Sequence, residues 1–370
     1  MTFFSDDFAL IATLVVLYLF LSLFLFLICF VLIHRYLLNR RGEKIEASTE
    51  RLLPLVYAYA DRSISRREFA DQLHSRYDVS ASFRIIREMI DNLKGEQKTR
   101  LKSLLDIPAY KKYFLTSLRS HTKIDIAQAC IYFERKNITD RSVIKRLKEL
   151  QGDSYSVISY SSTLALINAT NQTIRNDAVL SFLKRADSSS MAISDIIFEY
   201  VQSHPDPTEA GNLIAAQIED REIPAENAVS ILRLFPELGF YRQVDRLYRL
   251  FEEALAHDTK GRLTAALIDV LGEISTRDIA PVIIEKQLWK SPHQCVRLSV
   301  AEWIRYHYRP TFDKPLLELA FDGDLDVRLA AQRVLLSTGN AHQLKNAPEI
   351  PHVSEWRDLA EAEQEEHYAG

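Results

Sequence analysis

The chain has 370 residues and a formal net charge of −4, with 46 Lys and Arg against 50 Asp and Glu. A nucleic-acid-binding domain usually carries a concentrated basic stripe, so this near balance argues against nucleic acid as a ligand. Only 10 residues are Gly, which favours helices joined by short loops over sheets with tight turns. The composition therefore predicts an all-α protein.

The first predicted element is an uncharged apolar run at residues 8–33, made mostly of Leu, Phe, Ile and Val. About 20 such residues cross the ~30 Å hydrocarbon core of a bilayer as a helix. A cleavable signal peptide is the competing interpretation, but its apolar region would span only about 7–15 residues behind a basic flank. Here Asp6 and Asp7 precede the run. We therefore expect residues 1–38 to form a permanent transmembrane anchor.

The charges beside this run predict its orientation. Arg35, Arg40, Arg41 and Lys44 follow the run, whereas no Lys or Arg precedes it. Because positively charged flanks stay on the cytoplasmic side, we expect a single-pass protein with its N-terminus outside and the rest of the chain in the cytoplasm. In a bacterium this would be the inner membrane. Three cysteines without a CxxC pair agree with a reducing compartment.

Residues 39–121 are predicted to contain a juxtamembrane linker and a small helical module. Residues 39–48 are either that linker or a polar continuation of the membrane helix. Two short helices are expected between residues 49 and 71, because Ser65 stands three residues before Glu68 as in a capping box. A further helix is expected at residues 81–93.

Basic residues occur at two places within residues 39–121, directly after the membrane segment and after the expected helix at 81–93. A solvated helical face is one interpretation of them. Contact with anionic lipid headgroups is the other, because the anchor holds this part of the chain at the bilayer. The residues predicted to make that contact are Arg40, Arg41, Lys44, Lys94, Lys98, Arg100 and Lys102.

From residue 122 to 348 apolar-faced segments of about a dozen residues alternate with short polar breaks. Several prolines stand at these breaks or in first turns, where a missing amide costs least. Helix pairs repeating every ~30–40 residues are typical of an α-solenoid. The predicted helices are 124–135, 140–150, 154–168, 172–185, 190–201, 208–218, 225–235, 241–256, 261–274, 278–289, 294–306, 314–321 and 326–336.

Three of these segments align on an Arg-Leu start at Arg262, Arg297 and Arg328, with offsets of 35 and 31 residues. In the last copy Asp326 and Val327 stand directly before Arg328. This pattern resembles the HEAT repeat, in which an Asp-x-Arg element opens one helix of each pair. The resemblance implies a HEAT-like α-solenoid in which the Arg bonds an acidic residue of a neighbouring repeat. It says nothing about function.

The sequence contains no Gly-rich phosphate loop, no nucleophile elbow, no His-Glu-x-x-His and no Cys/His metal spacing. No catalytic residue, cofactor or metal ligand is therefore predicted. Protein interfaces use Trp, Tyr and Arg as anchors, so an aromatic and basic cluster is the predicted partner contact. The competing interpretation of this cluster is packing between repeats. Its members are Trp303, Arg305, Tyr306, Tyr308 and Arg309.

Residues 349–370 form an acidic tail with seven carboxylates against one Arg. Val353, Trp356 and Leu359 make a short amphipathic patch there, either a docking peptide or part of a polar terminus. The whole sequence predicts a membrane-anchored cytoplasmic scaffold or adaptor that binds a protein partner in a membrane complex. By analogy of fold, an accessory role in an envelope or polysaccharide-export complex is expected. The alternative is an enzyme or small-ligand sensor built on the same solenoid.

Overall fold

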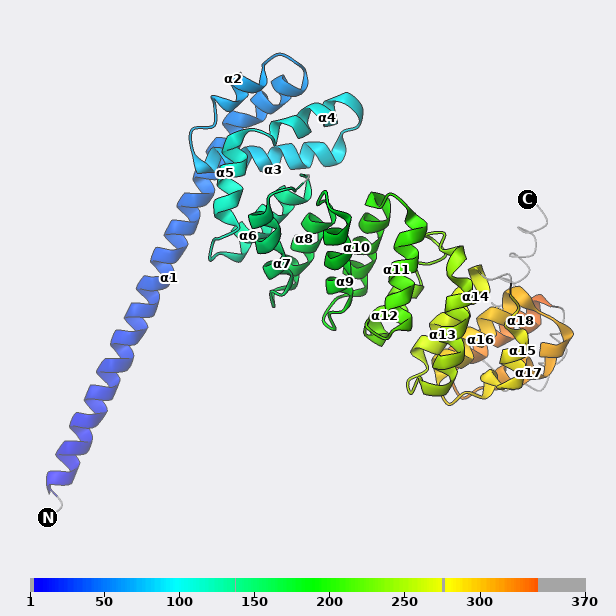
Figure 1. Cartoon of the computed structure of the whole chain (residues 1–370). Helices are drawn as coiled ribbons and strands as arrows, with labels where there is room; N and C mark the ends of the chain where they lie inside the picture. Colours follow the sequence, from blue (N-terminus) through cyan, green and yellow to red (C-terminus); the bar gives the residue numbers. More distant parts are fainter. Residues whose placement is uncertain (1–2, 137, 275–276, 339–370) are drawn as a thin grey trace. The chain divides into compact units, whose positions relative to one another are not determined.

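The computed structural model describes residues 3–136, 138–274 and 277–338 (Figure 1). Within these ranges the regular structure is helical, apart from one isolated bridge between Ile138 and Ala169. The all-α prediction is confirmed for this part of the chain. The chain divides into two compact units, of which the first ends at Ser120 and the second begins at His121. The predicted acidic tail, with Val353, Trp356 and Leu359, lies outside the described residues.

The first unit contains five helices. Its helices are α1 (Phe3–Ala60), α2 (Arg66–Ala70), α3 (Arg76–Asn92), α4 (Gly95–Leu104) and α5 (Pro108–Ser117). Helices α3 and α4 both pack against α1, and α5 packs against α3.

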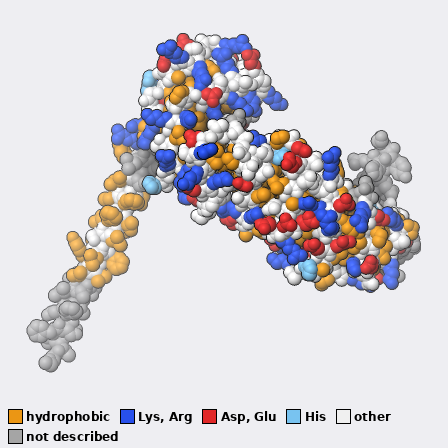
Figure 2. Space-filling view, viewed as in Figure 1, with side chains coloured by type: hydrophobic (Ala, Val, Ile, Leu, Met, Phe, Trp, Pro, Cys, Tyr) orange, Lys and Arg blue, Asp and Glu red, His pale blue; other side chains and the backbone are white. Residues whose placement is uncertain are grey.

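Helix α1 contains the apolar segment. Residues Val15–Ile33 are long and apolar enough to cross a membrane, and none of them is buried. At 1.5 Å per residue, these 19 residues extend for about 28 Å, close to the thickness of a hydrocarbon core. Figure 2 shows hydrophobic side chains covering this part of the helix. The side chains of the predicted span that precede Val15 lie outside the described ones.

Helix α1 does not end at the membrane segment but continues to Ala60. The polar stretch 39–48 is therefore a helical continuation, and the first of the two short helices predicted between 49 and 71 is wrong. The physical reason is packing: Leu52, Val56 and Tyr59 are buried on the face of α1 toward α3 and α4. This apolar stripe holds the helix together through Pro54.

Capping boxes begin the next two helices. Ser65 Oγ accepts from the Glu68 amide at 3.2 Å, and the Glu68 carboxylate accepts from the Ser65 amide at 2.6 Å, which confirms the predicted box. Ser75 and Asp78 form the same arrangement at the start of α3, which begins earlier than predicted. The buried Asp78 carboxylate also accepts from the Arg51 guanidinium of α1 at 2.5 Å. The pairing ties α3 to α1.

The second unit contains thirteen described α-helices, close to the predicted segments. They are α6 (Lys123–Glu134), α7 (Arg141–Gln151), α8 (Ser156–Ile167), α9 (Gln172–Leu183), α10 (Ser190–Ser203), α11 (Pro207–Glu219), α12 (Ala225–Leu232), α13 (Val244–His257), α14 (Arg262–Ile274), α15 (Ala280–Glu285), α16 (Gln294–His307), α17 (Asp313–Leu319) and α18 (Leu325–Ser337). Short 3₁₀ turns stand at Tyr241–Gln243, Leu288–Lys290 and Pro310–Phe312.

Packing in the second unit follows the order of the chain. Helices α6, α8, α10, α12, α14, α16 and α18, here called the even row, each pack against the next member of the row (Figure 1). The intervening helices cover one side of it, and α7 packs on α9 as α11 does on α13. One continuous hydrophobic cluster runs from Ile167 of α8 to Leu335 of α18.

The segment predicted as one helix at 278–289 is interrupted. Helix α15 ends at Glu285, and Gln287 adopts a left-handed backbone with φ of 48° before the 3₁₀ turn that carries Trp289. A residue with a Cβ rarely takes this conformation inside a helix, so the chain turns there. The turn brings the Trp289 indole nitrogen to 2.8 Å from the Glu318 carboxylate of α17.

Candidate functional site

The predicted partner contact on α16 is only partly exposed. Tyr306 is 75% exposed, whereas Trp303 is 5% exposed, so the prediction of an exposed Trp303 is wrong. The Trp303 indole stacks on His307 with ring centroids 4.5 Å apart and lies over Gly272 of α14. A Cβ at residue 272 would come to 2.6 Å from the indole Cδ1, so glycine is required for this close approach. Trp303 therefore holds α14 and α16 together.

The other members of that cluster have partners within the unit. The half-buried Arg305 lies over the Tyr306 ring and 3.9 Å from Glu302. The Tyr308 hydroxyl donates to Asp313 at 2.6 Å. Arg309 forms an ion pair with Asp278 at 2.6 Å. Tyr306 is thus the most exposed aromatic member of the cluster, with Arg305 over its ring.

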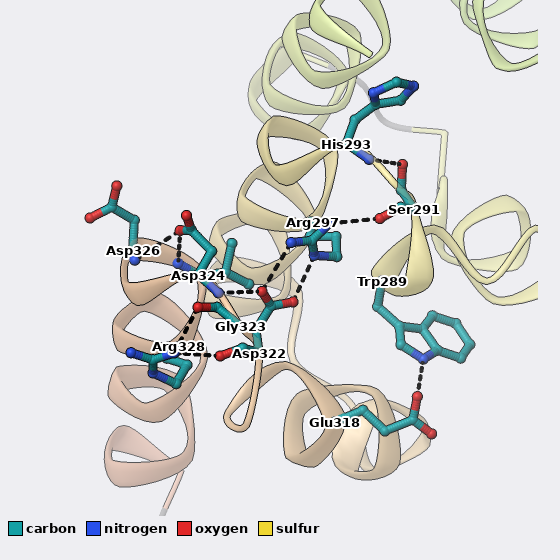
Figure 3. A network of polar contacts seen from close by, with 11 residues as sticks. Trp289, Ser291, His293, Arg297, Glu318, Asp322, Gly323, Asp324, Asp326 and Arg328 are labelled. Carbon is teal, nitrogen blue, oxygen red and sulfur yellow. Dashed lines mark hydrogen bonds and ion pairs between the residues drawn. The ribbon is translucent and has the colours of Figure 1, made fainter. Parts of the chain in front are cut away.

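Two of the three arginines aligned by the sequence, Arg297 and Arg328, lie in one network of polar contacts (Figure 3). Arg297 donates through Nε and Nη2 to the two oxygens of Asp322, at 2.6 and 3.0 Å, and through Nη1 to the Ser291 carbonyl at 2.8 Å. It thereby joins the turn before α16 to the turn before α18. Burial raises the pKa of the Asp322 carboxyl, but hydrogen bonds from Arg297 and the Asp324 amide outweigh it and leave the pKa below its usual range.

The other two aligned arginines bond differently from each other. Arg262 pairs with Glu226 of the preceding even-row helix at 2.7 Å. Arg328 instead donates to the carbonyls of Asp322 and Gly323 in its own turn, at 2.6 and 3.0 Å (Figure 3). Arg297 and Arg262 thus each bind a carboxylate outside their own helix, in the turn before α18 and on α12. Arg328 belongs to the last described helix, so the described chain has no later turn for it to reach.

The structure adds Arg175 of α9, which the sequence alignment missed. Arg175, Arg297 and Arg328 each donate to the carbonyl six residues earlier. Each is the fourth residue of its helix. Arg175 also reaches the Ser203 carbonyl at 2.8 Å, at the C-terminal end of α10, whereas Arg297 reaches the turn before α18. The signal that could have found it is an Arg four residues after the N-cap.

Three of the basic residues predicted to meet lipid headgroups lie on α1, at different distances from the membrane segment. Arg40 and Lys44 are exposed and follow Ile33 by about 10 and 16 Å along the helix axis. The Arg41 side chain lies outside the described ones. Lys44 also lies 5.3 Å from the ring of Tyr77 on α3. These positions are compatible with the headgroup layer and its immediate vicinity.

Arg100 of α4, one of the residues predicted to meet headgroups, has partners within the first unit. Its guanidinium donates to the Tyr59 carbonyl at 2.6 Å and lies 4.6 Å from the Tyr59 ring, so it caps the end of α1. Tyr59 follows Ile33 by about 39 Å of helix. Lys94 and Lys102 are exposed and Lys98 is half-buried on α4. A spanning α1 near the membrane normal places them beyond the ~8 Å screening length of the membrane surface.

A groove of about 340 Å³ opens between the first turns of α8 and α10. Its apolar wall contains Val157, Phe182 and Met191, and Met191 is 75% exposed. Arg185, Asp187 and Asp195 supply its charges. We call this site the α8–α10 groove; the lining residues are Ser156, Val157, Ser159, Tyr160, Phe182, Arg185, Asp187, Ser188, Ser189, Met191, Ala192 and Asp195.

The positively charged side chain that lines the α8–α10 groove, Arg185, already has partners within the protein. Arg185 donates to the carbonyls of Gln151 and Asp153 at 2.6 and 3.3 Å, and it binds the Asp187 carboxylate at 2.8 Å. These bonds join the turn before α10 to the turn before α8. The Arg185 side chain is 19% exposed. Arg185 therefore acts as a structural link and neutralises Asp187, which leaves Asp195 as the groove carboxylate that faces an incoming ligand.

Asp195 of the groove lies beside Tyr160. The Tyr160 hydroxyl donates to Asp195 at 3.2 Å. Burial first, then Asp195, Glu134 and Glu199, raises the pKa of Tyr160 to about 12. Sequence reasoning missed this site. The available signal was Met191, Asp195 and Glu199 at four-residue spacing, which places all three on one line of α10.

A larger open cavity of about 1050 Å³ lies among α13, α14, α15 and α16. Charges of both signs line it, including Glu252, Lys286, Lys290 and His293. Lys286 and Lys290 pair with Glu285 and Glu318. Among the residues that the structure describes, no group of three His, Cys, Asp or Glu side chains could hold a metal ion. The charges that line this cavity thus favour neither an anionic nor a cationic ligand.

Comparison with known proteins adds no relative: no family model matches the chain, and no curated protein matches it significantly.

Proposed function

We propose that this chain is a single-pass membrane protein whose second unit is a HEAT-like α-solenoid that binds a protein partner in the membrane. Its N-terminus would lie outside and the rest in the cytoplasm, on the inner membrane in a bacterium. The observation that carries the proposal is one helix, α1. It presents the fully exposed apolar segment Val15–Ile33 and continues without a break into the first unit.

The packing of the second unit supports a solenoid. Contacts from each even-row helix to the next, and a single core along the row, are what stacked repeats produce. The shared bond of Arg175, Arg297 and Arg328 to a carbonyl six residues earlier supports a repeated structural unit. A stacked row of this kind presents a long surface with exposed side chains, which suits binding of an extended partner segment.

The anchor supplies the mechanism. A tether raises the effective concentration of a binding surface for partners held in the same membrane, often to the millimolar range for short tethers. A modest affinity in solution then suffices for stable association. The scaffold function needs no catalytic group. The exposed Met191 and Val157 in the α8–α10 groove favour this surface as the contact.

Site-specific photocrosslinking in native membranes tests the proposal. A photoreactive phenylalanine analogue replaces Met191 in the full-length chain, and a control chain carries it at Lys145, an exposed residue of α7. We expect a covalent product with one integral membrane protein from residue 191 and none from residue 145. Absence of such a product, or equal products from both positions, would overturn the proposal.

A further inference from the structure

The α8–α10 groove has an apolar part of a size that suits one or two side chains. Phe182 is buried beneath it, while Val157 is 46% and Met191 75% exposed. Exposed apolar side chains around a concavity mark protein contacts more often than isolated surface residues do. The Ser188 hydroxyl oxygen lies in this lining and is buried without a hydrogen-bond partner among the described residues. It can accept from or donate to a bound chain.

The charges that α8 and α10 bring to the groove are carboxylates. Helix α10 contains Asp195 and Glu199 and neither Lys nor Arg, and α8 contains no charged residue. Asp195 and Glu199 extend the charge from Met191 along α10, four residues apart. A ligand lying along this line would meet an apolar contact first and two carboxylates after it.

The N-termini of two helices at the groove would favour an anionic ligand instead, because each carries roughly half a positive charge. Both are largely satisfied within the unit. The Asp153 carboxylate accepts from the Tyr155 amide at 2.8 Å before α8, and Ser189 caps α10 through the Ala192 amide at 3.2 Å. Asp187 is already paired with Arg185, but the carboxylate charges of Asp195 and Glu199 outweigh what remains of the two helix ends. The complementary ligand is therefore a cation.

We propose that the α8–α10 groove binds a cytoplasmic segment of an integral membrane protein in which a Lys or Arg follows an apolar side chain. The inference rests on the proposed function. Membrane proteins carry an excess of Lys and Arg in short cytoplasmic loops, within about 15–20 residues of a span. Such segments join apolar and basic residues, as the groove requires. The chain's own tail, with seven carboxylates against one Arg at 349–370, has the wrong sign.

A binding measurement with full-length protein in phosphatidylcholine nanodiscs tests this chemistry, since that lipid does not attract basic peptides. The probe is a fluorescent twelve-residue peptide of alternating Leu and Lys, and its counterpart replaces Lys with Glu. The test variant is Asp195→Asn with Glu199→Gln, which removes two charges and keeps the side-chain shapes. The matched control is Glu237→Gln with Glu252→Gln, two exposed carboxylates outside the groove.

We expect the Lys peptide to bind and the Glu peptide not to bind. The test variant should weaken Lys-peptide binding by about fivefold or more, and the control variant by less than about twofold. Met191→Ser should weaken it without changing its salt dependence. Equal binding of both peptides, or an unchanged affinity in the test variant, would overturn the inference. A crosslink from residue 191 alongside that result would leave the scaffold function standing and overturn only the inference about the ligand, whereas loss of the crosslink would overturn both.

Discussion

Replacing Arg297 with Ala should destabilise the C-terminal part of the second unit by about 2–3 kcal/mol. The side chains of Arg297 and Asp322 are 18% and 10% exposed, and Arg297 supplies two bonds to the carboxylate and one to the Ser291 carbonyl. Breaking a buried ion pair costs about 3–5 kcal/mol, because one charge stays buried alone. Because Asp322 keeps the Asp324 amide at 2.8 Å, we expect a cost at or just below the lower limit of that range.

Urea unfolding of the full-length protein in detergent measures this loss through Trp fluorescence, since Trp289 and Trp303 both pack in this region. The matched control is Arg309→Ala, whose ion pair with Asp278 has side chains 52% and 37% exposed. An exposed pair contributes about 0–1 kcal/mol. Arg297→Lys should fall between the two variants because it keeps the charge and loses the fork. If Arg297→Ala unfolds within ~0.5 kcal/mol of Arg309→Ala, the proposed link between turns has no structural role.

Three further outcomes are expected. Gly272→Ala should destabilise the protein by about 1–3 kcal/mol, although alanine has the better helix propensity, because the added Cβ would lie 2.6 Å from the Trp303 indole. The control is Gly323→Ala, which has open space around the added Cβ and should show no such loss in urea unfolding. The lowered pKa of Asp322 contributes stability above about pH 4 that is lost as the pH falls through the folded-state pKa, so unfolding between pH 7 and pH 3 should depend less on pH in Asp322→Asn. Gln287→Gly should raise the unfolding free energy by about 1 kcal/mol in the same assay, because glycine takes its φ of 48° without strain.

Most helices of the second unit could be predicted because local signals mark their ends. Asp140, Asn171, Asp206 and Asp324 each cap a helix with a side-chain oxygen. The continuation of α1 to Ala60 could not be predicted in this way. A proline usually ends a helix. The helix continues through Pro54 because α3, a helix that lies later in the chain, buries the neighbouring residues.

The predicted contact residues show where sequence reasoning fails. Trp303 and Tyr306 are both aromatic residues of α16, yet one is buried and the other exposed. The difference depends on Gly272, which lies on α14 and therefore has no effect on the sequence pattern of α16. The α8–α10 groove has the same origin, since Val157, Phe182 and Met191 come from separate segments. Local patterns predict helices, but a concavity requires the packing of several of them.

The same packing separates structural from functional charges. At the turns, Arg175, Arg185 and Arg297 bond to backbone carbonyls and have little freedom to meet a partner. These arginines of the chain therefore have a structural role and do not mark a binding site. Asp195 and Glu199 lie instead on one line of α10, and neither forms an ion pair with another described residue. Specificity for a partner can change at such positions without loss of the stack, because the bonds that hold the turns together lie elsewhere.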